Sequence, residues 1–231
     1  HNAGTATIQQ AIDAVRARGG GTICLDVGTY VLGTPLDMSN VRSLRMRGQG
    51  WRTILQPGEA GRAIRIARGI GVAIENLSIV GIVAGGGTTA MINVVNSVDL
   101  QFRHLAIAAS TGGNATSAAI GFAGIILSAA VEDCMLVAEQ AIVSMTGEPN
   151  YLLTANLRVV DNVFMCSQRG VSFTGSSLHY GQARFADNLF LICAQAGMTL
   201  TGAALPAASV TIEGNVLHVS GVGIIAGTDG L

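Results

Sequence analysis

Hydrophobic residues along this chain alternate with polar ones over short stretches, and these stretches recur at regular distances. The repeats centre on positions 76, 104, 134, 162, 188 and 215, so neighbouring centres lie 26 to 30 residues apart. One alternating stretch precedes each centre and a second follows it. A third runs between small residues, as in Gly170–Gly175 and Gly197–Gly202. Three short strands per repeat without helical periodicity predict the coils of a parallel β-helix.

The centres of the repeats are rich in asparagine. They are Asn76, His104, Cys134, Asn162, Asn188 and Asn215. A tight bend between two strands needs a residue that tolerates the left-handed conformation, and asparagine does so better than any residue except glycine. We therefore expect the asparagines to form the bends. In stacked coils, Asn162, Asn188 and Asn215 would form a ladder in which each side-chain amide bonds the next. This pattern favours a structural role for them over a functional one.

The first 21 residues follow a different period. Ile8, Ala11, Ile12 and Val15 recur at helical spacing, Thr5 or Thr7 is placed to cap the helix, and glycines follow at 19–21. We predict an all-β chain in which residues 1–21 form an amphipathic helix that caps one end. Residues 22–231 then form a single parallel β-helix of about seven to eight coils. The chain stops within a coil, so we expect further protein or a stacking partner at the carboxyl end.

The opening residues resemble a known superfamily. The run from Thr7 to Val15, then 19–25 and 27–32, is similar to the amino-terminal opening of pectate-lyase-like right-handed β-helix proteins. The run 41–50 with 53–55 looks like the next coil of that opening. The superfamily includes polysaccharide lyases, glycoside hydrolases, epimerases, phage tailspikes and non-catalytic members. The resemblance thus implies the fold, and an extracellular or cell-surface location, without transferring one activity.

Composition narrows the classes of partner. The 231 residues carry 13 basic and 14 acidic side chains, a balance that argues against nucleic acid or an anionic membrane surface as the partner. Glycine, asparagine, serine or a charge interrupts every apolar stretch, so no membrane span is expected. The four cysteines show no CxxC pair, which disfavours a zinc site, and we expect neither metal nor cofactor.

Cys166 and Cys193 occupy matching places in neighbouring repeats. Coil spacing of about 4.8 Å is compatible with a disulfide between them. The matching residues of the flanking repeats are Val137 and Val219, which favours an apolar ladder of free thiols. Whether the two cysteines pair stays open at this point.

The third stretch of each repeat alternates between apolar and hydroxyl residues. We align the third stretches of the repeats on the glycine that ends each of them. In this alignment we expect the apolar set to point inward: Val143, Met145, Val171, Phe173, Met198 and Leu200. The outward set is then Ser144, Thr146, Ser172, Thr174, Thr199 and Thr201. This outer face has neither carboxylates nor arginine. It therefore lacks both the calcium cluster of a lyase and the carboxylate pair of a hydrolase.

Catalytic chemistry would then come from the flanking turns. Glu148, His179 and Tyr180 are candidate acid and base groups, with Tyr151 as a platform for a sugar ring. The alternative is an ordinary polar loop edge.

The opposite edge carries Gln168 and Arg169, together with Glu139, Gln140 and Gln195, a ridge able to bond sugar hydroxyls. Here the alternative is a set of solvated turn residues. The substrate-binding candidates are Tyr151, Gln168, Arg169, Ser172, Thr174 and Thr199.

Arg158 and Arg184 also repeat one coil apart, with Asp161 and Asp187 three residues after each. Such a row forms either a surface ladder of alternating charges or an anion-binding strip, and the pattern favours the ladder.

Two functions fit these features. The first is a carbohydrate-interacting β-helix module that binds a polysaccharide or oligosaccharide; if it is an enzyme, we expect a polysaccharide lyase or glycoside hydrolase. The alternative is a non-catalytic structural or assembly module of a larger protein or particle.

Overall fold

The computed structural model of the chain describes residues 7–58, 61–84, 86–145, 151–174, 178–201 and 209–227. It opens with helix α1 (Ile8–Ala17), which begins at Thr7 with a capping box. The Gln10 amide donates to the Thr7 hydroxyl, and the Thr7 amide donates to the Gln10 side chain. No helix among the described residues is long and apolar enough to cross a membrane.

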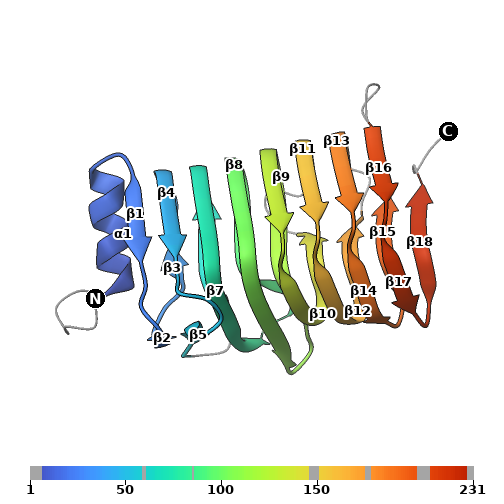
Figure 1. Ribbon diagram of the computed structural model, residues 1–231, viewed down its shortest axis with the longest axis horizontal. Coiled ribbons are helices and arrows are strands. Elements are labelled where there is room, and N and C mark those ends of the chain that lie inside the picture. Colours follow the sequence, from blue (N-terminus) through green and yellow to red (C-terminus); the bar gives the residue numbers. More distant parts are fainter. Residues whose placement is uncertain are drawn as a thin grey trace.

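α1 lies across the first coil, as predicted (Figure 1). Its buried residues, Ile12 and Val15, join the core of the coils. Its polar side is fastened to the strand at Asp37. The Asp37 amide donates to the Gln9 side chain at 2.9 Å, and Arg16 donates to the Asp37 carbonyl at 2.7 Å. The helix therefore covers apolar residues that would otherwise face water at this end.

Strands from successive coils pair in parallel and build three faces of a solenoid (Figure 1). Face 1 consists of β1 (Gly21–Cys24), β4 (Arg42–Arg47), β7 (Ile70–Ala84), β8 (Gly87–Gly112), β9 (Ala115–Glu132), β11 (Leu152–Val160), β13 (Leu178–Ala186) and β16 (Ser209–Glu213). The long strands β7, β8 and β9 bend at the corners and continue into a neighbouring face.

Face 2 follows the asparagine corner. It consists of β2 (Gly28–Leu32), β5 (Thr53–Pro57), parts of β7 and β8, β10 (Met135–Ser144), β12 (Val163–Phe173), β14 (Leu189–Cys193) and β17 (Val216–Val219). Face 3 contains the third stretch of each repeat. It consists of β3 (Leu36–Asp37), β6 (Ile64–Ala67), the ends of β8, β9, β10 and β12, β15 (Ala196–Thr201) and β18 (Val222–Gly227).

The corner between faces 1 and 2 contains the predicted asparagine ladder. Asn162 Nδ2 donates to Asn188 Oδ1 at 3.0 Å, and Asn188 Nδ2 donates to Asn215 Oδ1 at 2.9 Å. Each Oδ1 also accepts the backbone amide of the matching residue one coil earlier, beginning with Cys134. The structural interpretation of these asparagines is confirmed.

The bend itself differs from the prediction in four of these six coils. The left-handed residues at this corner are Asn76, His104, Asp133, Asp161, Asp187 and Gly214. Asparagine makes the bend only at Asn76. In the later coils the residue before the ladder position bends the chain, and the asparagine side chain is then free to turn inward and bond buried carbonyls.

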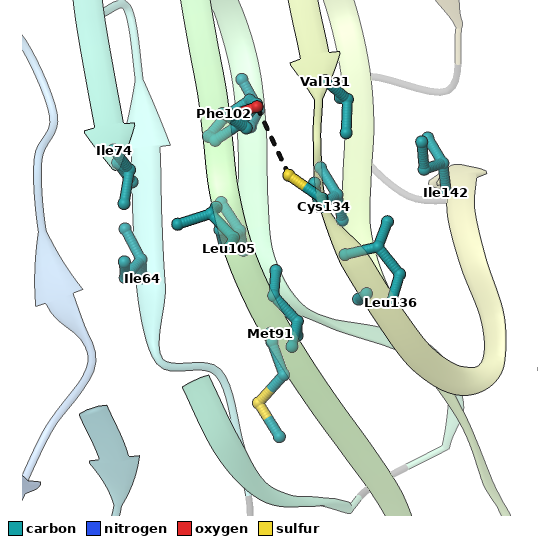
Figure 2. Close-up of a cluster of buried hydrophobic side chains, with 14 of the residues drawn as sticks. Ile64, Ile74, Met91, Phe102, Leu105, Val131, Cys134, Leu136 and Ile142 are labelled. Carbon is teal, nitrogen blue, oxygen red and sulfur yellow. Dashed lines mark hydrogen bonds between the residues drawn. The ribbon is translucent and has the colours of Figure 1, made fainter. Parts of the chain in front are cut away.

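Rows of aliphatic and aromatic side chains fill the interior of the coils. Phe164 and Phe190 stack one coil apart, with ring centroids 4.6 Å from each other. Cys134 takes the ladder position where the asparagines end, and its thiol lies 3.5 Å from the Phe102 carbonyl (Figure 2). The core is therefore continuous from coil to coil, so each coil depends on its neighbours for burial.

The outer side of face 1 is a ladder of ion pairs. Glu132 accepts from Arg103 at 2.8 Å and from Arg158 at 3.0 Å, while Arg184 pairs with Glu213 at 2.8 Å. The arginines form ion pairs, as a charge ladder requires, but their acidic partners are not the predicted Asp161 and Asp187. The partners of Arg158 and Arg184 are glutamates one coil away, since parallel pairing places these two rows side by side.

Candidate functional site

Face 3 confirms most of the predicted alternation. Val171, Phe173, Met198 and Leu200 lie in the core. Ser172 and Thr199 therefore point to the opposite side, in register with each other. Both are more than nine-tenths buried, and among the described residues the Thr199 hydroxyl has no hydrogen-bond partner. These two hydroxyls form a covered pair.

The prediction for Val143 and Met145 is wrong. Ile142 pairs with Val171 and occupies the core position, so Val143 aligns with Ser172 on the outer side. There Val143 and Met145 pack with Ala90 and Ala118 in a cluster separate from the core. The cause is that the closing glycines are not equivalent: Gly147 lies five positions after Ile142, whereas Gly175 lies four positions after Val171.

The prediction that Ser144 points outward is also wrong, because Ser144 pairs with the core residue Phe122 and lies on the inner side. Its hydroxyl accepts the Thr174 amide at 3.1 Å and donates to the Thr174 carbonyl at 3.3 Å. Val143 therefore interrupts a polar outer row of face 3, which begins with Asp37, Arg65 and Asn93 in the earlier coils and ends with Ser172 and Thr199.

The predicted catalytic edge falls largely outside the described structure. Glu148 lies outside the described residues, and for His179 and Tyr180 only the backbone is described, paired with Leu153 and Thr154. Tyr151 is 42% exposed, and its carbonyl accepts the Gly124 amide. The acid and base roles of Glu148, His179 and Tyr180 stay predictions.

The predicted ridge lies between faces 2 and 3. Gln168 and Arg169 are half-buried, and the Gln168 carbonyl accepts the Gln195 amide at 2.9 Å. Arg169 aligns with Gln140 in the preceding coil. Within the described ranges Arg169 forms no ion pair, and its buried Nε has no hydrogen-bond partner.

A groove of about 450 Å³ crosses several coils beside this ridge. Its lining residue Ser167 directly precedes Gln168 and Arg169 in the sequence. Its apolar lining is Ala109, Val137, Ala138, Met165, Cys166 and Ile192. Its polar lining is Ser110, Thr111, Ser117, Glu139 and Ser167. An apolar floor with a few placed polar groups is typical of small-molecule sites.

Glu139 is held firmly in the groove wall. Its Oε2 accepts the Ser117 amide at 2.8 Å, and its own amide donates to the Ser117 hydroxyl at 3.0 Å. Ser117 is fully buried, so this reciprocal pair fixes the half-buried carboxylate. Among the described lining residues Glu139 is the sole carboxylate. It can accept hydrogen bonds from the hydroxyl groups of a ligand, but hydrolysis by a carboxylate pair would need a second one.

The thiols beside the groove are free. Cys166 lines it and Cys193 lies in the next coil, where both are buried. The side-chain hydrogen bond with Cys193, together with burial, raises the pKa of Cys166 and keeps it protonated. The free-thiol ladder is thus confirmed. Cys166 pairs with Ala138 and not with Val137, because β12 has one more residue than β10 between this pair and the pair of Gln140 with Arg169.

Metal-binding side chains do not gather on this surface. Within the described ranges, no group of three or more histidine, cysteine, aspartate or glutamate residues is placed to hold a metal ion.

Comparisons with known proteins give structural likenesses only. No family model and no curated protein matches the sequence. The chain is similar to the ORF18 protein of Geobacillus virus E2, with a TM-score of 0.29 and 13% identity over 90% of this chain; it spans 56% of that protein. It is also similar to the A-module of mannuronan C-5 epimerase AlgE4 from Azotobacter vinelandii, with a TM-score of 0.28 and 12% identity, covering 96% of this chain and 95% of the module. The parallel pairing of strands from successive coils shows that the chain is a parallel β-helix.

Proposed function

We propose that this β-helix is a carbohydrate-binding module and that an oligosaccharide lies in the groove beside Gln168 and Arg169. The observation that supports this most directly is the composition of the groove. Val137, Met165 and Ile192 offer an apolar surface to the C–H side of a sugar ring. Glu139 and the serine and threonine hydroxyls of the wall are placed to bond the ring's hydroxyl groups.

The orientation of the groove suits a chain-like ligand. Its lining comes from β8 and β9 in one coil and from β10, β12 and β14 in the three coils that follow. Because coils repeat about every 4.8 Å, the polar groups recur along the solenoid axis at a spacing fixed by the backbone. A ligand with repeating hydroxyl groups meets similar partners at successive positions. A polysaccharide fits that requirement better than a compact metabolite.

Arg169 bears on the kind of sugar. It follows the groove residue Ser167 by two positions and is half-buried without a described ion pair. A guanidinium forms bidentate hydrogen bonds with carboxylates. We therefore expect sugars that carry a carboxylate to bind more tightly than neutral ones.

The test is retention and titration on a panel of acidic and neutral polysaccharides. Glu139→Gln is expected to weaken binding about tenfold, because removing a charge-assisted hydrogen bond costs roughly 1.5 kcal/mol. Glu213→Gln, which removes an exposed carboxylate on face 1, is the matched control and should bind normally.

Arg169→Ala should reduce binding of acidic sugars more than of neutral ones. Unchanged binding in both Glu139→Gln and Arg169→Ala would refute the groove as the site. Release of new reducing ends or unsaturated ends, abolished by Glu148→Ala with His179→Ala, would instead support catalysis at the turn edge.

A further inference from the structure

The corner between faces 1 and 2 is longer in the second coil than in the coil that follows it. β4 pairs with β7 as far as Arg47, and β5 resumes that pairing at Ile54. Six residues lie between these two, whereas only two lie between their partners in β7. The segment 48–53, here called the Trp51 turn, thus has four residues more than the matching corner of the next coil. It contains the only tryptophan of the chain.

Hydrogen bonds to both neighbouring coils hold the backbone of the Trp51 turn. The Trp51 carbonyl accepts the Ser78 hydroxyl at 2.8 Å, and the Arg52 carbonyl accepts the Gly28 amide at 3.0 Å. Gly50 adopts the left-handed conformation, with a φ of 87°, and its amide donates to a carbonyl of the next coil at 2.9 Å. The turn is therefore fixed from both sides, and its side chains are positioned before a ligand arrives.

The side chains of the turn lie exposed although its backbone is held. Trp51 is 57% exposed. Arg47 directly before the turn and Arg52 within it are also exposed, and within the described ranges neither forms an ion pair or a side-chain hydrogen bond. Tryptophan and arginine are the residue types that contribute most binding energy at interfaces. A fixed turn that presents one tryptophan between two unpaired arginines has the composition of a binding site.

The charge around the turn favours an anionic ligand. Two carboxylates at this corner are already bonded: Glu75 accepts from Arg45 at 2.6 Å, and Asp26 accepts from Gln49 at 2.8 Å. Residues 1–68 contain nine of the thirteen arginines and four of the fourteen acidic residues, a formal charge of +5. The other four arginines and ten acidic residues give the rest of the chain −6. The first coils therefore attract anions more than the later ones do.

We propose that the Trp51 turn is a second binding site for acidic sugars, separate from the groove. The flat apolar face of an indole ring suits the C–H side of a sugar ring, and a guanidinium forms paired hydrogen bonds with a carboxylate. Trp51 with Arg47 and Arg52 offers both kinds of contact on one short segment. A single-stranded nucleic acid fits less well, because it stacks successive bases on several aromatic side chains and the turn offers one.

The Trp51 turn and the groove are independent sites. No residue of the turn belongs to the groove lining, which begins at Ala109 in β8. The inference rests on the proposed function for the class of ligand alone. Either site can therefore fail without the other, and an experiment that reports on the turn by itself can separate them.

Intrinsic fluorescence is such a report, because the chain has one tryptophan. Titration with oligogalacturonate, a carboxylated oligosaccharide, should shift the Trp51 emission to shorter wavelengths until it saturates, and the fully methyl-esterified oligosaccharide should not. Arg52→Gln should weaken this binding about tenfold, the effect of losing one charge-assisted hydrogen bond. Arg62→Gln, which removes another exposed arginine between β5 and β6, is the matched control and should bind normally. Both variants should keep the native Tm.

An emission spectrum that oligogalacturonate leaves unchanged overturns the inference. An equal response to the esterified form also overturns it, since the arginines would then have no part. An equal response to a single-stranded oligonucleotide overturns the assignment to sugars. Glu139→Gln and Arg169→Ala should leave the fluorescence titration unchanged. If these two variants lose retention on acidic polysaccharides while Trp51 stays silent, the groove is supported and the turn is refuted; the reverse result refutes the groove alone.

Discussion

The asparagine ladder gives the sharpest test of the fold. Asn188 is 1% exposed, and its side chain takes part in four hydrogen bonds. Replacing it with alanine leaves the Asn162 amide without an acceptor and the Val159 carbonyl without its side-chain donor. Each buried group left unsatisfied costs about 1–3 kcal/mol, so Asn188→Ala should lower the free energy of unfolding by about 3 kcal/mol.

Asn215 is the matched control because it has the same chemistry at the more exposed end of the ladder. Water can replace its lost bonds, so Asn215→Ala should cost only about 1 kcal/mol. For a chain of this size 1 kcal/mol corresponds to about 2–4 °C in Tm. Thermal and urea unfolding followed by circular dichroism should therefore separate the two variants by several degrees.

Asn188→Asp distinguishes lost hydrogen bonds from lost volume, since it keeps the shape of the side chain. Near neutral pH its carboxylate would face the Val159 carbonyl and Asn215 Oδ1, where the native amide donates. This variant should be at least as unstable as the alanine variant, and it should recover partly in acid, where a protonated carboxyl donates again. Equal stability of Asn188→Ala and Asn215→Ala would refute the idea that burial sets the cost.

Two further predictions concern the cysteines and the helix cap. Burial raises the pKa of Cys134 to about 12, so at pH 8 about one thiol in 10⁴ is ionised. Brief alkylation followed by mass spectrometry should modify the exposed Cys24 and spare Cys134, and rapid labelling of both in the folded protein would contradict the structure. Thr7→Ala removes the capping hydroxyl of α1 and should cost about 1 kcal/mol in urea unfolding, whereas Thr7→Ser should cost little; equal losses would rule out the cap.

The sequence predicted the fold well because a solenoid repeats its packing. The period of 26 to 30 residues indicates the coil, and the stacked asparagines indicate the corner. The helix from Ile8 was readable from its spacing and from Thr7. Each of these signals is local or strictly periodic, so tertiary packing has little opportunity to override it.

The candidate site was less accessible to sequence reasoning, and β10 shows why. Four residues lie between Ile142 and Gly147, but only three lie between Val171 and Gly175. The closing glycine was therefore a misleading register mark, and Val143 was assigned to the wrong side. The extra residue before Gly147 was the available signal, because one added residue reverses the side of every residue that is counted back from that glycine.

Glu139 illustrates a second limit of sequence reasoning. It was recognised as part of a polar ridge, but its partner Ser117 lies 22 residues earlier, a separation that the coil period does not predict. The pair of Glu139 with Ser117 depends on where β9 and β10 leave face 3, and the lengths of the turns decide that.

In a solenoid the inward rows alone determine burial, so the outward rows are free to differ between faces. Faces 1 and 2 show this directly: the same coils present ion pairs on one side and an uncharged apolar face on the other. Substitutions in the outward rows should therefore alter binding while the inward rows hold the fold, which is why the tests of function use Glu139 and Arg169.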